Sequence, residues 1–194
     1  MKNRNISFSD KNSARAFFSS VRAAIPADKH EEYSQALCHG IEMLDEYKNS
    51  DTVLLYFPTR SEPDLRDLAE HALNGGKKVA LPISNTEACT LTFCEVSDFD
   101  ELSLGAYGIA EPSKTAKTAA LTQKTLCIVP ALALDRDGYR LGYGKGYYDR
   151  FLEKFNGITV CAIFSELLCD RLPRLDTDIP VKIIITETGA IRLK

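Results

Sequence analysis

The chain has 194 residues, of which 44% are hydrophobic and 26% are charged, a composition that excludes a disordered or fibrous protein and predicts one globular domain over 1–194. A net charge of −3 does not favour nucleic acid or an anionic membrane as a partner, so a small-molecule partner is expected. The opening residues lack an apolar core of signal-peptide length, and no run reaches the roughly 18 apolar residues of a membrane span, which predicts a cytoplasmic protein.

Apolar side chains recur at helical spacing over 14–21 and again over 33–44, which predicts two amphipathic helices at the start of the chain. Asp10 or Asn12 is a suitable N-cap for the first helix. Six cysteines without a CxxC spacing, several in apolar runs, predict buried reduced thiols rather than a zinc site. They are Cys38, Cys89, Cys94, Cys127, Cys161 and Cys169.

Short apolar runs then alternate with helical patterns along the rest of the chain, as in βαβ units. The long polar segment 97–123, which contains YGIAEP, is a candidate functional loop. The alternation predicts an α/β protein with a single open, mostly parallel sheet flanked by helices in three α/β/α layers. The predicted strands are 52–57, 77–82, 91–96, 125–134, 158–164 and 181–186, the last before the C-terminus, and the predicted helices are 62–76 and 146–155.

Residues 140–150, RLGYGKGYYDR, place three glycines at alternate positions beside charged side chains and two tyrosines. The segment follows the predicted strand at 125–134, and ligands of open α/β sheets bind at the C-terminal ends of strands. Its backbone N–H groups are suited to an anion such as a phosphate. However, Lys145 is followed by Gly146 rather than by the Ser or Thr of a Walker loop, and the dinucleotide fingerprint has its third glycine one residue later. The residues alone therefore leave a phosphate-binding loop and a structural turn as equal alternatives.

The longer segment 130–152, PALALDRDGYRLGYGKGYYDRFL, resembles the signature of the 5-formyltetrahydrofolate cyclo-ligases, also called 5,10-methenyltetrahydrofolate synthetases. Five further segments resemble the family in the same order along the chain. They are Lys11 with Arg15, FPTRSE at 57–62, KKVALP at 77–82, YGIAEP at 107–112 and LPRLDTDIPV at 172–181.

The resemblance implies a monomeric enzyme that uses ATP as co-substrate and Mg²⁺ as cofactor to convert 5-formyltetrahydrofolate into 5,10-methenyltetrahydrofolate, ADP and phosphate. In the family's mechanism the formyl oxygen accepts the γ-phosphoryl group, N10 closes the ring and phosphate leaves. Positioning and charge neutralisation are what phosphoryl transfer requires of a protein. A non-catalytic nucleotide- or folate-binding regulator on the same scaffold is the alternative, and fold-level analogy alone adds a sugar-phosphate isomerase or acyl-CoA-type enzyme.

Matching the family's motifs residue by residue assigns the site. Lys145 and Arg140 are implied to be catalytic, Phe57 and Glu62 to bind the folate, and Asp149 and Asp178 to bind magnesium. The ATP contacts are implied to be Lys11, Arg15, Arg140, Leu141, Gly142, Tyr143, Gly144, Lys145, Gly146, Tyr147 and Tyr148, and those from Tyr143 to Tyr147 are implied to border the folate as well.

Each assignment has a structural alternative. Lys11 and Arg15 could form a solvated helix face, Lys145 a surface turn, and the tyrosines part of the core. Glu62 could favour a helix N-terminus, and the aspartates could be cap or turn residues. The chain also departs from the family pattern. Ala131 replaces a glycine, Leu167 replaces a glutamine of the pocket, and Lys182 replaces an acidic residue and is expected to change the charge near Asp178.

Overall fold

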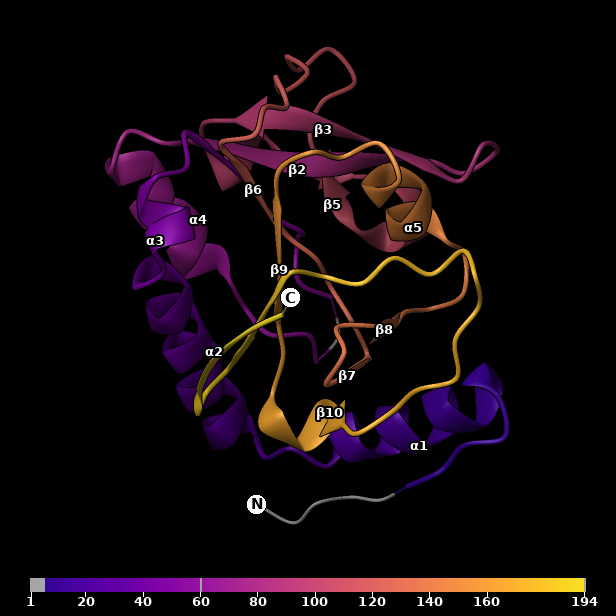
Figure 1. Cartoon of the computed structure of the whole chain (residues 1–194). Helices are drawn as coiled ribbons and strands as arrows, with labels where there is room; N and C mark the ends of the chain where they lie inside the picture. The colour runs from indigo at the N-terminus through magenta and orange to yellow at the C-terminus, as the bar shows by residue number, and fades with distance from the viewer. Residues whose placement is uncertain (1–5, 60, 194) are drawn as a thin grey trace.

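A computed structural model describes residues 6–59 and 61–193 and contains a central seven-stranded sheet (Figure 1). The strand order is β12-β11-β9-β6-β1-β2-β3, and the five inner strands from β11 to β2 run parallel, whereas β12 and β3 are antiparallel edges. The strands are β1 (Thr52–Leu54), β2 (Lys78–Asn85), β3 (Thr90–Val96), β6 (Thr125–Ile128), β9 (Ile158–Ala162), β11 (Ile183–Thr186) and β12 (Gly189–Arg192).

Continuous burial explains why the inner strands are uninterrupted apolar runs. All residues of β1, β6 and β11 are buried, as expected of parallel strands covered on both faces. β1 lies between β2 and β6, so the chain leaves β1 toward one side of the sheet and later returns on its other side. This reversal of strand order is where open α/β sheets form a crevice at the C-terminal strand ends.

Helices cover both faces of the sheet, which confirms the predicted α/β architecture (Figure 1). Helix α2 packs on β11 and on α4, and α4 packs on β2, whereas α5 lies on the other side against β3. Within the described residues no helix has the length and apolar character needed to cross a membrane. The helices are α1 (Lys11–Ala23), α2 (Ala27–Glu42), α3 (Asp45–Lys48), α4 (Arg66–Asn74) and α5 (Tyr147–Leu152).

Asp10 is the N-cap of α1 and confirms one of the two predicted caps. Its carboxylate accepts hydrogen bonds from the backbone N–H groups of Asn12 and Ser13, both at 2.8 Å, and the Ser13 side chain completes a capping box. Ala14 and Phe18 bury the inner face of α1. The start and the rotation of α1 are thereby fixed by short-range signals.

The prediction of one strand over 125–134 is wrong. β6 ends at Ile128, and Pro130, which has no N–H to donate, follows two residues later. The chain then enters a separate three-stranded sheet of order β10-β7-β8. Its strands are β7 (Ala133–Asp135), β8 (Arg140–Leu141) and β10 (Leu168–Cys169).

Two other segments differ from expectation. β11 is not the last strand, because β12 pairs with it in a hairpin whose turn uses Gly189 at φ 135°. The segment 97–123 contains short structure in place of a plain loop, and the buried carboxylate of Glu111 accepts from the Ser84 N–H at 3.1 Å. Its elements are η1 (Phe99–Glu101), β4 (Ser103–Leu104), η2 (Ala106–Gly108) and β5 (Ala110–Glu111), and a further turn, η3 (Ser165–Leu167), follows β9.

Candidate active site

The glycine loop, residues 142–146, connects β8 to α5 at the C-terminal side of the sheet. Gly144 and Gly146 have φ of 91° and 71°, a backbone region that side chains with a Cβ rarely adopt. A Cβ on Gly144 would also lie 3.0 Å from Nη2 of Arg15. Gly146 is the residue immediately before α5. The loop therefore needs glycine both for its conformation and for the approach of a cation.

Helix α1 brings two of the predicted cations to this loop. Arg15 donates from Nε to the Gly142 carbonyl at 2.8 Å and from Nη1 to Asn12 at 2.7 Å. Lys11, one turn earlier on the same face, has Nζ 2.6 Å from both carboxylate oxygens of Asp178. The alternative of a solvated helix face is therefore wrong for both residues.

Arg140 lies on β8 with only 5% of its side chain exposed. Its guanidinium donates to the Ile179 carbonyl at 2.6 Å and to Oδ1 of Asp149 at 2.7 Å. The Asp149 oxygen also accepts from the Ile179 N–H at 3.4 Å. Arg140, which precedes the glycine loop, thus contacts Asp149, which follows it, and also the segment that carries Asp178.

Lys145 is exposed at the outer bend of the glycine loop, and within the described residues its amine forms no ion pair. Its backbone carbonyl accepts from Nη1 of Arg150 at 2.8 Å, and the same nitrogen donates to the Cys89 carbonyl at 3.2 Å. Arg150 was not among the predicted site residues, although it ties the loop to the turn between β2 and β3. Its signal in the sequence is its place one turn after Gly146.

The tyrosines of the motif differ in environment. Tyr147 hydrogen-bonds through its hydroxyl to that of Tyr107 at 3.1 Å, and this bond is the main reason that the pKa of Tyr147 is raised to about 12. The Tyr148 hydroxyl is buried without a hydrogen-bond partner in the described part of the chain. Burial raises its pKa well above the ordinary value, the charge of Glu62 raises it further, and that of Arg140 lowers it. The charges of Glu62 and Arg140 thus act on the pKa of Tyr148 in opposite directions.

Glu62 follows β1 and is 6% exposed. Its Oε2 accepts from the backbone N–H of Thr59 at 3.0 Å and from the Thr59 hydroxyl at 2.9 Å. Because α4 begins only at Arg66, Glu62 does not lie in its first turn, and the helix-charge alternative is wrong. Phe57 lies beside Phe99, with ring centroids 6.2 Å apart, at a hollow of about 410 Å³.

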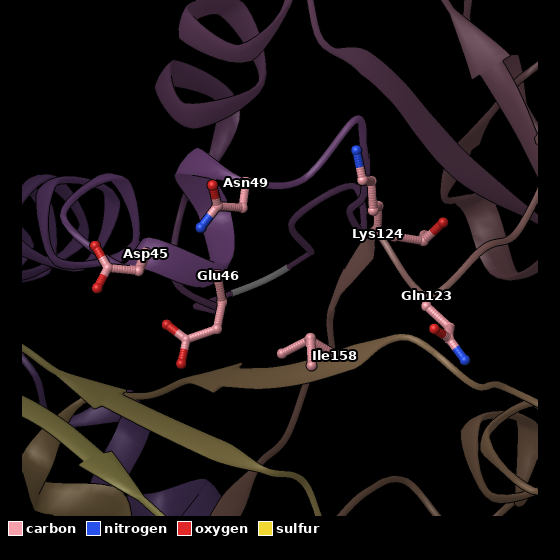
Figure 2. Close-up of a pocket in the computed structure, with 7 residues that line it drawn as sticks. Asp45, Glu46, Asn49, Gln123, Lys124 and Ile158 are labelled. Atoms are coloured by element: carbon pink, nitrogen blue, oxygen red, sulfur yellow. The ribbon is translucent and has the colours of Figure 1, made fainter.

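A second hollow of about 290 Å³ lies at the opposite edge of the sheet, where β6 begins at Thr125 and β9 at Ile158. Figure 2 shows Asp45 and Glu46 on one side of it and Lys124 on the other. The two carboxylates disfavour a polyanion. The C-terminal edge therefore remains the candidate site.

The two predicted magnesium ligands are each paired with a cation, Asp149 with Arg140 and Asp178 with Lys11. Asp178 also accepts from the Leu175 N–H at 2.7 Å, as its turn alternative expects. Across 6–59 and 61–193 no three acidic, histidine or cysteine side chains are grouped as ligands for a metal ion.

Two of the departures from the family pattern, Ala131 and Leu167, follow the C-terminal ends of β6 and β9. Leu167 is fully buried and belongs to the hydrophobic core. Lys182 donates from Nζ to the Gly157 carbonyl at 3.0 Å, just before β9 begins, so the expected change of charge near Asp178 is not found. Ala131 is buried between β6 and β7.

Comparisons with known proteins agree with this architecture. The model of the 5-formyltetrahydrofolate cyclo-ligase family matches residues 7–187. The NMR structure of 5,10-methenyltetrahydrofolate synthetase from Aquifex aeolicus superposes with a TM-score of 0.83 at 33% identity, over 95% of this chain and 93% of that one. The mouse 5-formyltetrahydrofolate cyclo-ligase is 24% identical over 92% of this chain and 94% of its own length, and a probable one from Schizosaccharomyces pombe is 30% identical over 75% and 72%. The chain therefore belongs to the 5-formyltetrahydrofolate cyclo-ligase family, whose members are ATP-dependent ligases.

Proposed function

We propose that this chain converts 5-formyltetrahydrofolate into 5,10-methenyltetrahydrofolate at the expense of ATP, with magnesium. The formyl oxygen attacks the γ-phosphorus, and ADP leaves. The N10 lone pair then attacks the formyl carbon, the carbon–oxygen bond breaks with release of phosphate, and N10 loses its proton. Phosphorylation is needed because an amide-like oxygen is otherwise a poor leaving group.

The observation that supports this proposal most is the juxtaposition of two segments at the reversal of strand order. The segment that holds Phe57 and Glu62 follows β1, and the segment that leads to the glycine loop follows the neighbouring strand β6. A folate bound at the first segment would therefore have its reacting end beside a triphosphate bound at the second.

The cations take the charge-neutralising roles in this proposal. Arg15 and Lys145 have no carboxylate partner among the described residues, so they are available to the phosphates without the loss of an ion pair. Lys145, on the exposed bend, reaches the transferring phosphoryl and the formyl oxygen. Arg140, held on two sides, supplies a guanidinium that needs little reorganisation during the reaction.

Asp149 is the better magnesium contact of the two aspartates. Its side chain is 29% exposed, and the Arg140 guanidinium and the Ile179 N–H both donate to Oδ1 of its carboxylate. Magnesium commonly uses one or two carboxylates together with phosphate oxygens and water, and it would neutralise charge on the triphosphate. Both oxygens of Asp178 contact Lys11, so a metal contact there requires Lys11 to leave.

The folate end depends on hydrogen-bond complementarity. Glu62 presents a carboxylate that is held by Thr59 and is suited to accept from the amino and ring N–H groups of a pterin. Phe57 provides an apolar ring at the hollow that it lines together with Phe99.

The test is a spectrophotometric assay of methenyl product from 5-formyltetrahydrofolate, with ATP and magnesium each omitted in turn. We expect product only when all three are present. Binding of ATP and folate without product would identify the non-catalytic regulator, and turnover without ATP would overturn the proposal.

A further inference from the structure

Arg22, in the last turn of α1, lies beneath the glycine loop and was not predicted to belong to the site. It is 4% exposed, although it is charged. Its Nη2 donates to the hydroxyl of Tyr143, and its guanidinium carbon lies 5.9 Å from the centre of that ring. Tyr143 stands in the glycine loop between Gly142 and Gly144 and is 48% exposed. Arg22 thus connects α1 to the glycine loop.

The charge of Arg22 is not compensated within the described part of the chain. No acidic side chain there forms an ion pair with it, and Nη1 is buried without a hydrogen-bond partner. Lys11 and Arg140, by contrast, each have an aspartate. A buried charge without a partner disfavours the folded state, so its presence requires an explanation.

The spacing on α1 provides that explanation. Arg22 lies two helical turns after Arg15 on the same face, and Arg15 itself contacts the Gly142 carbonyl. The helix therefore holds the glycine loop at two consecutive residues, through the Gly142 carbonyl and the Tyr143 hydroxyl. Both contacts bring positive charge to the loop to which the proposed function assigns the triphosphate.

We propose that Arg22 is a positioning residue of the ATP site. It fixes Tyr143, and with it the glycine loop, in the conformation that receives the triphosphate, and the bound phosphates compensate its charge. The proposal rests on the proposed function, because it takes ATP as the anion that the loop binds. It extends the site by a residue that acts through Tyr143 and not by direct contact with the substrate.

The experiment measures ATP affinity by calorimetry, with magnesium and without folate, and melting temperature without ATP. The variants are Arg22→Met, which keeps the length of the side chain, Tyr143→Phe, which removes one hydroxyl, and the double variant. Tyr47→Phe is the matched control, because Tyr47 also has a cation over its ring, Lys77 at 4.9 Å, but lies far from the loop. All four are compared with the unmodified chain.

We expect Arg22→Met to raise the dissociation constant for ATP about 10-fold and Tyr143→Phe about 3-fold, the range for the net loss of one ordinary hydrogen bond. The double variant should be no weaker than Arg22→Met, because both changes remove the same contact. The melting temperature of Arg22→Met without ATP should equal or exceed that of the unmodified chain, and Tyr47→Phe should bind ATP normally.

Unchanged ATP affinity in Arg22→Met, or fully additive effects in the double variant, would overturn the proposal. So would a lower melting temperature with normal affinity, since that result assigns Arg22 a purely structural role. If Arg22→Met does not fold, normal ATP affinity in Tyr143→Phe would likewise overturn the proposal. Failure of the unmodified chain to bind ATP would instead refute the proposed function, and the inference with it.

Discussion

Lys11 and Asp178, 167 residues apart in sequence, form an ion pair in which Nζ lies 2.6 Å from both carboxylate oxygens. Arg140 and Asp149 form a second pair at 2.7 Å. Each pair joins an expected phosphate-binding cation to an expected magnesium ligand. When ATP and magnesium bind together, the phosphates can pair with the two cations and magnesium with the two aspartates, so no charge is left unpaired. ATP alone has to displace the aspartates from the cations and leaves them without a partner.

Asp178→Asn should therefore tighten ATP binding in the absence of magnesium, because Lys11 becomes free for the phosphates. We expect the dissociation constant to fall about 3- to 10-fold, the equivalent of one ordinary net hydrogen bond. Calorimetric titration with ATP in a chelating buffer measures it.

Asp176→Asn is the matched control, because it removes the same charge from an exposed position in the same segment. Its ATP affinity should not change. If Asp178 also binds magnesium directly, Asp178→Asn should in addition weaken ATP binding in the presence of magnesium, which loss of the Lys11 ion pair alone would not do.

Asp149→Asn should lower the free energy of unfolding by about 1–2 kcal/mol, since the nearly buried Arg140 loses a charged partner that is itself partly exposed. It should also raise the magnesium concentration needed for half-maximal activity, because an amide oxygen is a weaker ligand than a carboxylate. Urea denaturation and magnesium titration give the two values.

Asp137→Asn serves for comparison, since Asp137 contacts Arg174 from an exposed position in the preceding turn. Its magnesium requirement should be normal and its loss of stability about 0–1 kcal/mol. Equal magnesium curves for Asp149→Asn and the unmodified chain would remove Asp149 from the metal site.

Local patterns predicted the parts of the fold that depend on nearby residues. The apolar runs at β1 and β6 identified buried parallel strands, and Asp10 identified the start of α1. The run at 125–134 failed because apolar character continues through Pro130 while the chain passes from one sheet to another. Apolar patterning reports burial, and it does not report which sheet supplies the hydrogen bonds.

The candidate site was only partly predictable for a related reason. Glycines and charges in one segment indicated the loop, but the partners of Lys11 and Arg140 come from a segment whose position depends on the whole fold. Arg22 had a signal, its helical spacing from Arg15, which is ambiguous because the same spacing describes a solvated face. Only the burial of Arg22 in the folded chain distinguishes a residue of the site from one on a solvated face.

The cysteines give a prediction about reactivity. Brief alkylation of the folded protein with iodoacetamide at pH 8 should modify Cys89, which is half-buried in the turn between β2 and β3, before any other. Burial raises the pKa of Cys38, Cys161 and Cys169 to about 12, so they carry almost no thiolate. Burial also raises the pKa of Cys94 and Cys127.

Mass spectrometry of digested protein locates the label, and protein unfolded in urea should be labelled at all six positions. Early labelling of the buried Cys127 would show that the sheet opens more readily than its burial indicates.

Glu62→Gln should raise KM for 5-formyltetrahydrofolate about 5- to 150-fold, the equivalent of about 1–3 kcal/mol for polar groups left without a matching partner. The amide oxygen of glutamine can still accept from Thr59, so the loop after β1 should keep its structure and the melting temperature should change little. The amide nitrogen, however, presents donors to the pterin's own donors.

ATP affinity should be normal, because the glycine loop follows a different strand. Glu46→Gln removes a carboxylate at the opposite edge of the sheet and should leave both constants unchanged. Steady-state titration of each substrate separates the possibilities: an equal loss for folate and ATP would indicate a general disturbance of the crevice, and an unchanged KM for folate would place the pterin elsewhere.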